Sequence, residues 1–407
     1  MLVTLVAVTA SLPAFLVAAL AVQLRASLHF GASEQGISLA VYYLGAAAVS
    51  LPGSRLSERY GALRVMKSAA ADAVLLALLA SVVSSWALLT VLLALAGMTS
   101  SIVQPAANQF IARQVPAGRQ GIAFGVKQSA VPLSALLGGL AVPAIGLTIG
   151  WQWAFAFAAA IAVLAAVVLP RPISTIAQIR DAPRSESFSL PVLPLGVLTV
   201  GFGLGICAAS GLSAFLATSA VSAGLSKGGA GMVVALASAA AFGSRLVTGA
   251  RADRRGRRHF PVVAAMLGVG ALGDALLAVS SAEHLAVLFV LASVVAFGAG
   301  WGWNGLFNFA VVRTHPELPA RATGITQVGG RLGGVAGPLV VGLLVEHGSY
   351  SLAWSVVAVV ALVGALTVLA GRRLLLRARQ ASPAAPPVAP PPVPPPAPKE
   401  TPGLAER

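Results

Sequence analysis

The chain has 407 residues, of which 57% are hydrophobic and only 10% are charged, and its mean hydropathy is +0.88. Charged side chains make up roughly a quarter of a soluble globular domain, so this composition excludes an ordinary soluble enzyme. It also excludes disorder over most of the chain, because disordered segments have low hydrophobicity. The single cysteine, Cys207, cannot form a disulfide within the chain, which excludes a disulfide-stapled scaffold.

The net charge of +15 would by itself suggest nucleic-acid binding. The distribution of the charges argues against that function. Residues 73–83 and 152–169 carry none, and the basic residues gather in short clusters between such stretches. Alternation of this kind is typical of multi-pass membrane proteins. We therefore expect the chain to contact the lipid bilayer and no nucleic acid.

Twelve apolar windows are long enough to cross a bilayer, for which a helix needs about 20 residues. Several contain Gly or Pro, which membrane helices tolerate where neighbouring helices satisfy the freed backbone groups. The chain is therefore predicted to be an all-α integral membrane protein with twelve transmembrane helices. In chain order the predicted spans are residues 2–24, 36–53, 68–84, 87–111, 121–145, 153–169, 192–217, 229–249, 261–281, 285–312, 323–345 and 353–371.

The basic residues are unevenly divided between the two sets of alternate loops. Of the 27 Lys and Arg residues, all but five lie in one set or in the C-terminal segment. The other set holds only Arg25 and Lys227, while Lys127, Arg245 and Arg331 lie inside predicted spans. Because positively charged loops stay in the cytoplasm, we expect a multi-pass protein of the plasma membrane with both termini cytoplasmic.

The windows divide into two predicted bundles of six spans, residues 1–169 and 192–371, joined by a polar cytoplasmic linker at 170–191. Residues 372–407 form a Pro-rich cytoplasmic tail that we expect to be extended and disordered. Such a tail is either simply solvated or a docking site for a Pro-binding partner. We expect the protein to be a monomer.

The two predicted bundles repeat each other in the same order along the chain. The segment GASEQG, from Gly31 to Gly36, recurs as GLSKGG, from Gly224 to Gly229, and each copy has a Ser placed to cap the following helix, Ser33 in the first. Parallel repeats of this kind occur in secondary transporters. Further along, Gln104, Asn108, Arg113 and Pro116 recur as Asn304, Asn308, Arg313 and Pro316.

The loop between the eighth and ninth predicted spans reads GARADRRGRR, from Gly249 to Arg258, and resembles the loop signature of the major facilitator superfamily. A weaker copy, SRLSERYGA, runs from Ser54 to Ala62 between the second and third spans. The resemblance covers residues 1 to about 375. It implies two six-helix bundles that rock about a central site, which exposes the substrate to each side of the membrane in turn.

The same resemblance implies that the signature loops form a gate on the cytoplasmic face. An acidic residue there can pair with the flanking Arg residues and with nearby helix N-termini. The alternative is a basic cluster that only sets the orientation in the membrane. The implied gate residues are Glu58, Arg59, Gly61, Gly249, Asp253, Arg254, Gly256, Arg257 and Arg258.

Two departures from the family pattern bear on the subfamily. The fourth span lacks the Arg that is often associated with proton coupling. The fifth span has VPLSALLGG, from Val131 to Gly139, instead of the Gly-Pro-x-x-Gly-Gly run that is typical of drug antiporters. Efflux of hydrophobic drugs is therefore the less favoured function.

Ionisable residues inside a membrane are costly and suggest function. Lys127 lies six residues after Gly121 in the fifth span, and Arg331 lies seven after Gly324 in the eleventh, the span that the repeat pairs with it. We therefore predict that two cations lie at similar depth in the two bundles and bind an anionic substrate between them. The alternative is that each cation pairs locally with a carbonyl or a carboxylate.

Three other intramembrane charges have less specific interpretations. Arg245 lies four residues before Gly249, near the cytoplasmic end of its span, where it can snorkel to the surface, so we assign it to the gate rather than to the substrate. Asp274 and Asp72 are candidates for proton coupling, because a carboxyl group buried in the bilayer can hold a proton at neutral pH. A structural hydrogen bond to a neighbouring helix is the alternative for Asp274.

Six amide side chains on the fourth, fifth, tenth and eleventh spans are candidates for neutral hydrogen bonds to a substrate. Hydrogen bonds between helices are the alternative role for each of them. These residues are Gln104, Asn108, Gln128, Asn304, Asn308 and Gln327.

The sequence thus predicts a secondary active transporter of a small organic anion, coupled to protons. Proton-driven efflux of amphipathic compounds is the alternative within this class, and a membrane sensor without transport is the alternative outside it. The chain has no Walker loop and no nucleophile motif, and its five histidines are scattered. We therefore expect no enzymatic activity, no cofactor and no metal.

Overall fold

The structure is a computed structural model that describes residues 2–116, 120–170, 191–252, 259–315 and 318–381. All regular elements within these ranges are helices, as the sequence predicts for an all-α membrane protein. The N-terminal half contains α1 Leu2–Ala19, α2 Ala21–Leu28, α3 Ala32–Ala48, α4 Ser50–Tyr60, α5 Ala62–Ser81, α6 Trp86–Gln114, α7 Gln120–Gln128, α8 Ala130–Ala141, a π-helical turn Val142–Gly146, and α9 Trp151–Val168. The C-terminal half contains α10 Val192–Ser222, α11 Lys227–Ala252, α12 His259–Ala282, α13 Ala286–Gly300, α14 Asn304–Thr314, α15 Pro319–His347 and α16 Tyr350–Ala381.

Ten helical stretches among the described residues are long and apolar enough to cross a membrane. The two remaining predicted spans, 36–53 and 68–84, also fall on helices. The first is divided at Val49 into α3 and α4, and the second, α5, carries three charged residues, Arg64, Lys67 and Asp72. All twelve windows predicted from the hydrophobic pattern therefore fall on helices of the described chain.

The last helix extends beyond residue 371, where the predicted last span ends. Helix α16 continues to Ala381, beyond the apolar stretch and through Arg372, Arg373 and Arg377. Leu and Arg are both good helix formers, so the helix does not stop where the hydrophobicity does. Of the predicted disordered tail, residues 372–381 are thus helical, and residues 382–407 lie outside the described part of the chain.

Besides the second span, which is divided at Val49, two further spans of the described chain are interrupted near their middle. The fifth breaks at Ser129, between α7 and α8, three residues before Pro132. The tenth breaks at residues 301–303, a turn between α13 and α14. Proline has no N–H group to donate to the carbonyl four residues earlier, so the first break leaves a backbone carbonyl open in the interior.

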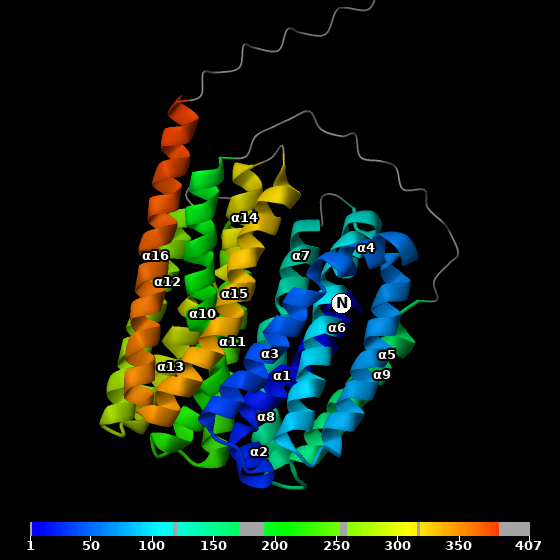
Figure 1. Cartoon of the computed structure of the whole chain (residues 1–407), viewed down its shortest axis with the longest axis vertical. Coiled ribbons are helices and arrows are strands. Elements are labelled where there is room, and N and C mark those ends of the chain that lie inside the picture. Colours follow the sequence, from blue (N-terminus) through cyan, green and yellow to red (C-terminus); the bar gives the residue numbers. More distant parts are fainter. Residues whose placement is uncertain (1, 117–119, 171–190, 253–258, 316–317, 382–407) are drawn as a thin grey trace, which may run out of the picture.

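Figure 1 shows the two halves side by side, with α1 to α9 (blue to green-cyan) in one bundle and α10 to α16 (green to red) in the other. Helix α3 packs against α15, and α8 packs against α11 across the boundary. Glycines allow these helices to approach closely. A Cβ atom at Gly139 would lie 2.6 Å from the backbone N of Ala235, and one at Gly36 would collide with the carbonyl of Pro338. Small residues favour close contact between helices in membranes.

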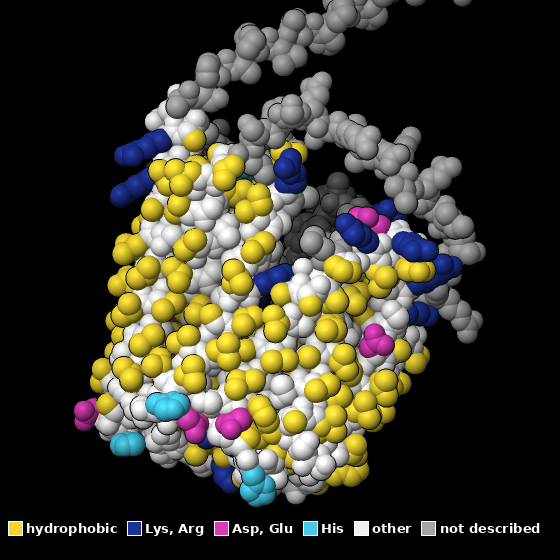
Figure 2. Space-filling view, in the orientation of Figure 1, with side chains coloured by type: hydrophobic (Ala, Val, Ile, Leu, Met, Phe, Trp, Pro, Cys, Tyr) yellow, Lys and Arg dark blue, Asp and Glu magenta, His cyan; other side chains and the backbone are white. Residues whose placement is uncertain are grey.

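The two ends of the molecule differ in charge and in closure. We call the end with the turns at Gly61, Val115 and His315 the basic end, and the end with the turns at 29–31, 147–150 and 223–226 the far end. In Figure 2 most of the Lys and Arg side chains lie at the basic end, where the surface is hollowed between the halves. The glycine contacts lie toward the far end, so the halves are closed there.

The outer surface is largely apolar. Large side chains such as Leu75, Val82, Val167 and Val287 are 57–76% exposed, and hydrophobic side chains cover much of the face drawn in Figure 2. A water-soluble monomer rarely exposes apolar patches of such extent. This surface is therefore suited to contact with lipid.

Candidate functional site

Lys127 is the most deeply buried of the three cations inside the spans. It lies in the last turn of α7 and is only 4% exposed. Its Nζ donates a hydrogen bond of 2.8 Å to Oδ1 of Asn108 on α6. Asn108 itself is exposed, so this buried ammonium group is joined to a polar side chain that solvent reaches.

The C-terminal half contains a matching pair. Nε2 of Gln327 on α15 donates to Oδ1 of Asn308 on α14 at 3.1 Å, and Nδ2 of Asn308 donates to Oδ1 of Asn304 at 3.0 Å. The two partners in each half are 19 residues apart in the chain. The repeat counterpart of Lys127 is therefore Gln327.

This register corrects the predicted pairing of Lys127 with Arg331. Counting from the glycines placed Arg331 at the depth of Lys127, whereas the amide partners place it one helical turn beyond Gln327. Arg331 is half-buried, and one of its Nη atoms donates to the carbonyl of Ala46 at 2.7 Å. Ala46 belongs to α3 of the other half, so Arg331 connects the two bundles.

Arg245 makes the second such connection. Its two Nη atoms donate to the carbonyl of Gln128 at 2.8 Å and to that of Trp301 at 3.0 Å, and its guanidinium lies 5.4 Å from the centre of the Trp301 ring. The Gln128 carbonyl has no helical donor because the residue four positions later is Pro132. Trp301 begins the turn that interrupts the tenth span. Arg245 thus binds two carbonyls that these breaks make accessible.

The expected snorkelling of Arg245 to the surface is therefore wrong. Helix α11 runs on to Ala252, which places Arg245 two turns from its end, and the side chain points into the boundary between the halves. Gln128, a predicted substrate-binding residue, contacts Arg245 through its backbone carbonyl. Gln104 is half-buried on α6, one turn before Asn108.

None of these three cations forms an ion pair with a carboxylate among the described residues. Their partners are the amide oxygen of Asn108 and three backbone carbonyls, and Nε of Arg245 is buried without a partner. Buried charges are normally paired with an opposite charge. We use the name cation cluster for Lys127, Arg245 and Arg331 together, because each lies inside a span and none has a carboxylate partner among the described residues.

The two candidate proton carriers lie in different surroundings. Asp274 is 3% exposed on α12, which packs against α13 and α16 within the C-terminal half. Its Oδ1 atom is buried without a hydrogen-bond partner. The Asp72 side chain is exposed on α5 and is not enclosed by neighbouring helices.

The candidate gate at the basic end is described in its first copy and, in its second copy, at Gly249. Glu58 and Arg59 are exposed on α4, and Gly61 separates α4 from α5 with a φ of +84°, a conformation that favours glycine. Gly249 is exposed on α11 with open space around its Cα. The remaining predicted gate residues, Asp253, Arg254, Gly256, Arg257 and Arg258, lie outside the described residues.

Known proteins resemble this chain in both sequence and fold. The sequence model of the major facilitator superfamily matches residues 3–317 and 195–404. The chain belongs to the major facilitator superfamily. Membership explains the duplicated bundle, the signature loops and the hollow between the halves. Among the described residues, no group of three His, Cys, Asp or Glu side chains is placed to hold a metal ion.

One relative and several solved structures show how similar this chain is to known proteins. An uncharacterized MFS-type transporter, YddS of Bacillus subtilis (strain 168), is 31% identical over 126 residues, which are 30% of this chain and 28% of that protein. The nucleoside transporter NupG and a D-xylose-proton symporter have TM-scores of 0.69 at 14% and 15% identity; the matches cover 91% and 90% of this chain and 100% and 95% of theirs. A bacterial Spinster homologue, in an inward-facing and occupied conformation, has a TM-score of 0.65 at 15% identity over 94% of this chain and 96% of its own. At these identities the structures share the fold.

Proposed function

We propose that this transporter-family protein carries a small organic anion across the plasma membrane by alternating access, coupled to protons, with the basic end in the cytoplasm. The single observation that carries the proposal is the cation cluster. Three cations lie at or near the boundary between the halves, and no described carboxylate neutralises them. A substrate that brings its own negative charge supplies the missing partner.

The contacts of the two arginines suggest how substrate binding is linked to movement. Arg331 and Arg245 each donate to a backbone carbonyl of the N-terminal half. A carboxylate is a stronger acceptor for a guanidinium than a neutral carbonyl is. An anion that binds here therefore competes for the groups that connect the bundles and makes it easier for one bundle to rotate against the other.

Asp274 supports proton coupling. A carboxyl group that is buried without a donor is more stable in its protonated, neutral form. Its place on α12 keeps it within the C-terminal half, apart from the boundary. We propose that Asp274 takes up and releases the coupled proton as its surroundings change between the two states of the transporter.

The amide groups support a second candidate function, transport of a neutral, hydroxyl-rich molecule. Gln327, Asn308 and Asn304 form a chain of hydrogen-bonding side chains, and such groups suit hydroxyls. Two structures of similar fold are named as a nucleoside transporter and a D-xylose-proton symporter. The effect of removing the cations distinguishes the two candidates.

The decisive experiment measures binding to the purified protein by thermal stabilisation and calorimetry. The ligands are acetate, lactate, pyruvate, succinate and benzoate, with xylose and uridine as neutral compounds. Lys127→Gln and Arg331→Gln are each expected to weaken the best anion by about 1.5–3 kcal/mol, the contribution of a hydrogen bond to a charged group. The exposed residues Lys227 and Arg321 provide the matched controls Lys227→Gln and Arg321→Gln, which should bind as wild type does.

Two results would count against the anion proposal. If wild type binds only the neutral compounds, or if both cation variants bind anions as tightly as wild type, the cation cluster does not bind the substrate. Neutral ligands whose affinity depends on Asn308 would then favour the second candidate.

A further inference from the structure

At the far end, the first turn of α3 is capped by a side chain from the other half of the molecule. Oε2 of Glu346, near the end of α15, accepts hydrogen bonds from the backbone N–H groups of Ala32 at 2.7 Å and Ser33 at 3.2 Å. The N–H of Gly31 donates to Oε2 of Glu34 at 3.0 Å. The first four N–H groups of a helix have no partner within it, and here two carboxylates satisfy three of them.

This arrangement replaces the cap predicted from sequence. Ser33 was expected to cap the helix, but its Oγ is buried without a partner. In the second repeat, the Oγ of Ser226 does accept a hydrogen bond from the N–H of Gly229 at 3.0 Å. The two copies therefore differ: one helix is capped from within its own half, and the other by an acidic group from the opposite half.

The contact joins a negative charge to the positive end of a helix. A carboxylate at a helix N-terminus is favoured by the helix dipole, and its hydrogen bonds are charge-assisted. Close by, Nε2 of Gln35 donates to the carbonyl of Ala214 at 2.7 Å across the same boundary. The glycine contact of Gly36 with Pro338 lies next to these bonds. Glu346 thus adds a directional electrostatic contact to packing that is otherwise neutral.

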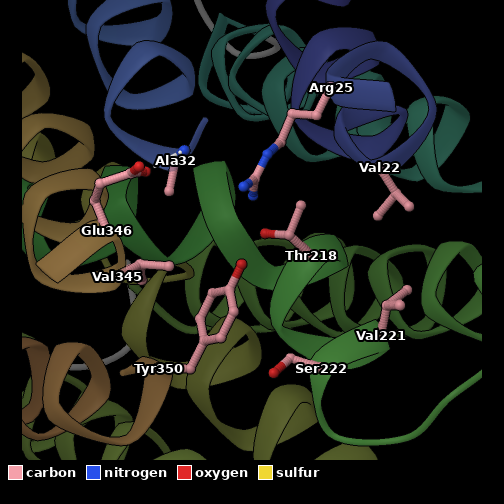
Figure 3. A pocket seen from close by; sticks show the side chains of 9 residues that line it. All are labelled: Val22, Arg25, Ala32, Thr218, Val221, Ser222, Val345, Glu346 and Tyr350. Carbon is pink, nitrogen blue, oxygen red and sulfur yellow. Dashed lines mark hydrogen bonds between the residues drawn. The ribbon is translucent and has the colours of Figure 1, made fainter. Parts of the chain in front are cut away.

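A water-accessible cavity adjoins this contact (Figure 3). It has a volume of about 500 Å³ and lies between the halves, with Arg25 and Val22 on α2 and with Thr218, Glu346 and Tyr350 on the C-terminal half. The Arg25 side chain reaches into it. Glu346 is exposed, so its carboxylate can exchange the α3 N–H groups for water with little desolvation cost. The contact is therefore suited to repeated breaking.

We propose that Glu346 is a latch that holds the far end closed, and that its release from α3 is a step in opening the transporter toward that side. The proposal rests on the alternating access put forward above. The latch joins residues that must separate when the halves part, because Ala32 and Glu346 belong to different bundles. Its strength then helps to set the ratio of the two states in the absence of substrate.

Gly31 allows the latch to be weakened in a second way. A Cβ atom built at Gly31 would lie 2.8 Å from Oε2 of Glu34 and 2.9 Å from Oε2 of Glu346. The φ of Gly31 is −92°, which alanine also adopts. Gly31→Ala therefore pushes the carboxylate away from α3 without straining the backbone, and it leaves the charge of Glu346 in place.

The test measures how often the far end opens. In a Cys207→Ser background, Leu39→Cys places a reporter thiol on α3 at a position that is 4% exposed and lines a small cavity between the halves. A membrane-impermeant maleimide is added from the far side in the absence of substrate. Glu346→Gln and Gly31→Ala should each raise the labelling rate by roughly two- to fivefold, the range for a charge at an exposed helix terminus. Glu283→Gln, which neutralises another exposed acid at the far end, should not change it.

Labelling at the same rate in wild type, Glu346→Gln and Gly31→Ala would overturn the latch and leave the proposed transport intact. If the reporter thiol is labelled in none of the variants, the far end does not open, and alternating access is overturned together with the latch. Loss of anion binding in the cation variants, measured separately, does not bear on the latch.

Discussion

The two halves of this transporter share a scaffold but not its chemistry. In the N-terminal half, Lys127 binds Asn108; in the C-terminal half, Gln327 binds Asn308 with the same spacing in the chain. Duplication has kept the amide partner in both copies, whereas only one copy holds a cation. The positions where the copies differ are thus more informative about function than those where they agree.

A second difference between the halves concerns backbone groups. Pro132 leaves the carbonyl of Gln128 open, and Arg245 binds it. The repeat counterpart of Pro132, in the register set by the amide pairs, is Leu332, which has an N–H to donate. The fifth span therefore offers an interior acceptor that its repeat counterpart, the eleventh span, lacks. Three experiments test how far the differences between the halves determine transport.

The largest effect is expected from the carboxylates of the third and ninth spans, Asp72 and Asp274, which differ in burial. Asp274→Asn should abolish accumulation of the anion driven by a pH gradient and leave exchange of labelled for unlabelled anion intact, because Asn cannot carry a proton. Asp72→Asn, at the exposed position, should retain accumulation. The measurement is uptake into proteoliposomes, and pH-driven accumulation by Asp274→Asn would refute its role.

An intermediate effect is expected when the second cation is restored. Gln327→Lys places an ammonium group beside Asn308, as Lys127 lies beside Asn108, and should tighten the binding of succinate about tenfold relative to lactate. This corresponds to about 1.4 kcal/mol, close to the smallest contribution expected of a hydrogen bond to a charged group. Calorimetry with both ligands measures the ratio. Gln327→Glu serves as the opposite control and should weaken both anions; an unchanged ratio in Gln327→Lys would show that this position does not face the substrate.

The smallest effect is expected from the backbone acceptor. Pro132→Ala supplies an N–H group for the carbonyl of Gln128. The hydrogen bond from Arg245 to this carbonyl should then contribute less to the stability of the protein. The stability of wild type, Arg245→Gln, Pro132→Ala and the double variant forms a thermodynamic cycle with an expected coupling of about 1 kcal/mol. Additive effects of the two substitutions would show that Arg245 does not depend on the open carbonyl.

The sequence predicts the helices well, because the length of each apolar stretch can be read directly from the local composition. All twelve windows fall on helices, and the loop around Asp253 resembles that of the correct family. Charge alone also identified Lys127 and Arg331 as unusual. The register between the fifth and eleventh spans is harder to predict, because both spans contain many glycines. Counting from Gly121 and Gly324 pairs Lys127 with Arg331, whereas the amide partners pair Lys127 with Gln327.

Contacts between distant residues account for what the sequence did not predict. The partner of Arg245 is a carbonyl exposed by a proline on another helix, so the signal is Pro132 rather than any side chain near Arg245. Glu346 lies 314 residues from Ala32, and only the packing of α3 against α15 brings them together. A proline inside a predicted span leaves the carbonyl four residues earlier without its helical donor, and this signal could have identified the Gln128 carbonyl as the partner of Arg245.

The glycine contacts at the far end also have a kinetic consequence. Gly36 meets the backbone of Pro338, and Gly139 meets that of Gly231, with almost no side chain between them. Helices that touch mainly through their backbones can move against each other without a change of side-chain rotamer. The barrier to state exchange should then depend mainly on the few polar bonds at the boundary and on the surrounding lipid. A bulky side chain at Gly139 would push α8 away from α11, and we expect this substitution to change the rate of turnover.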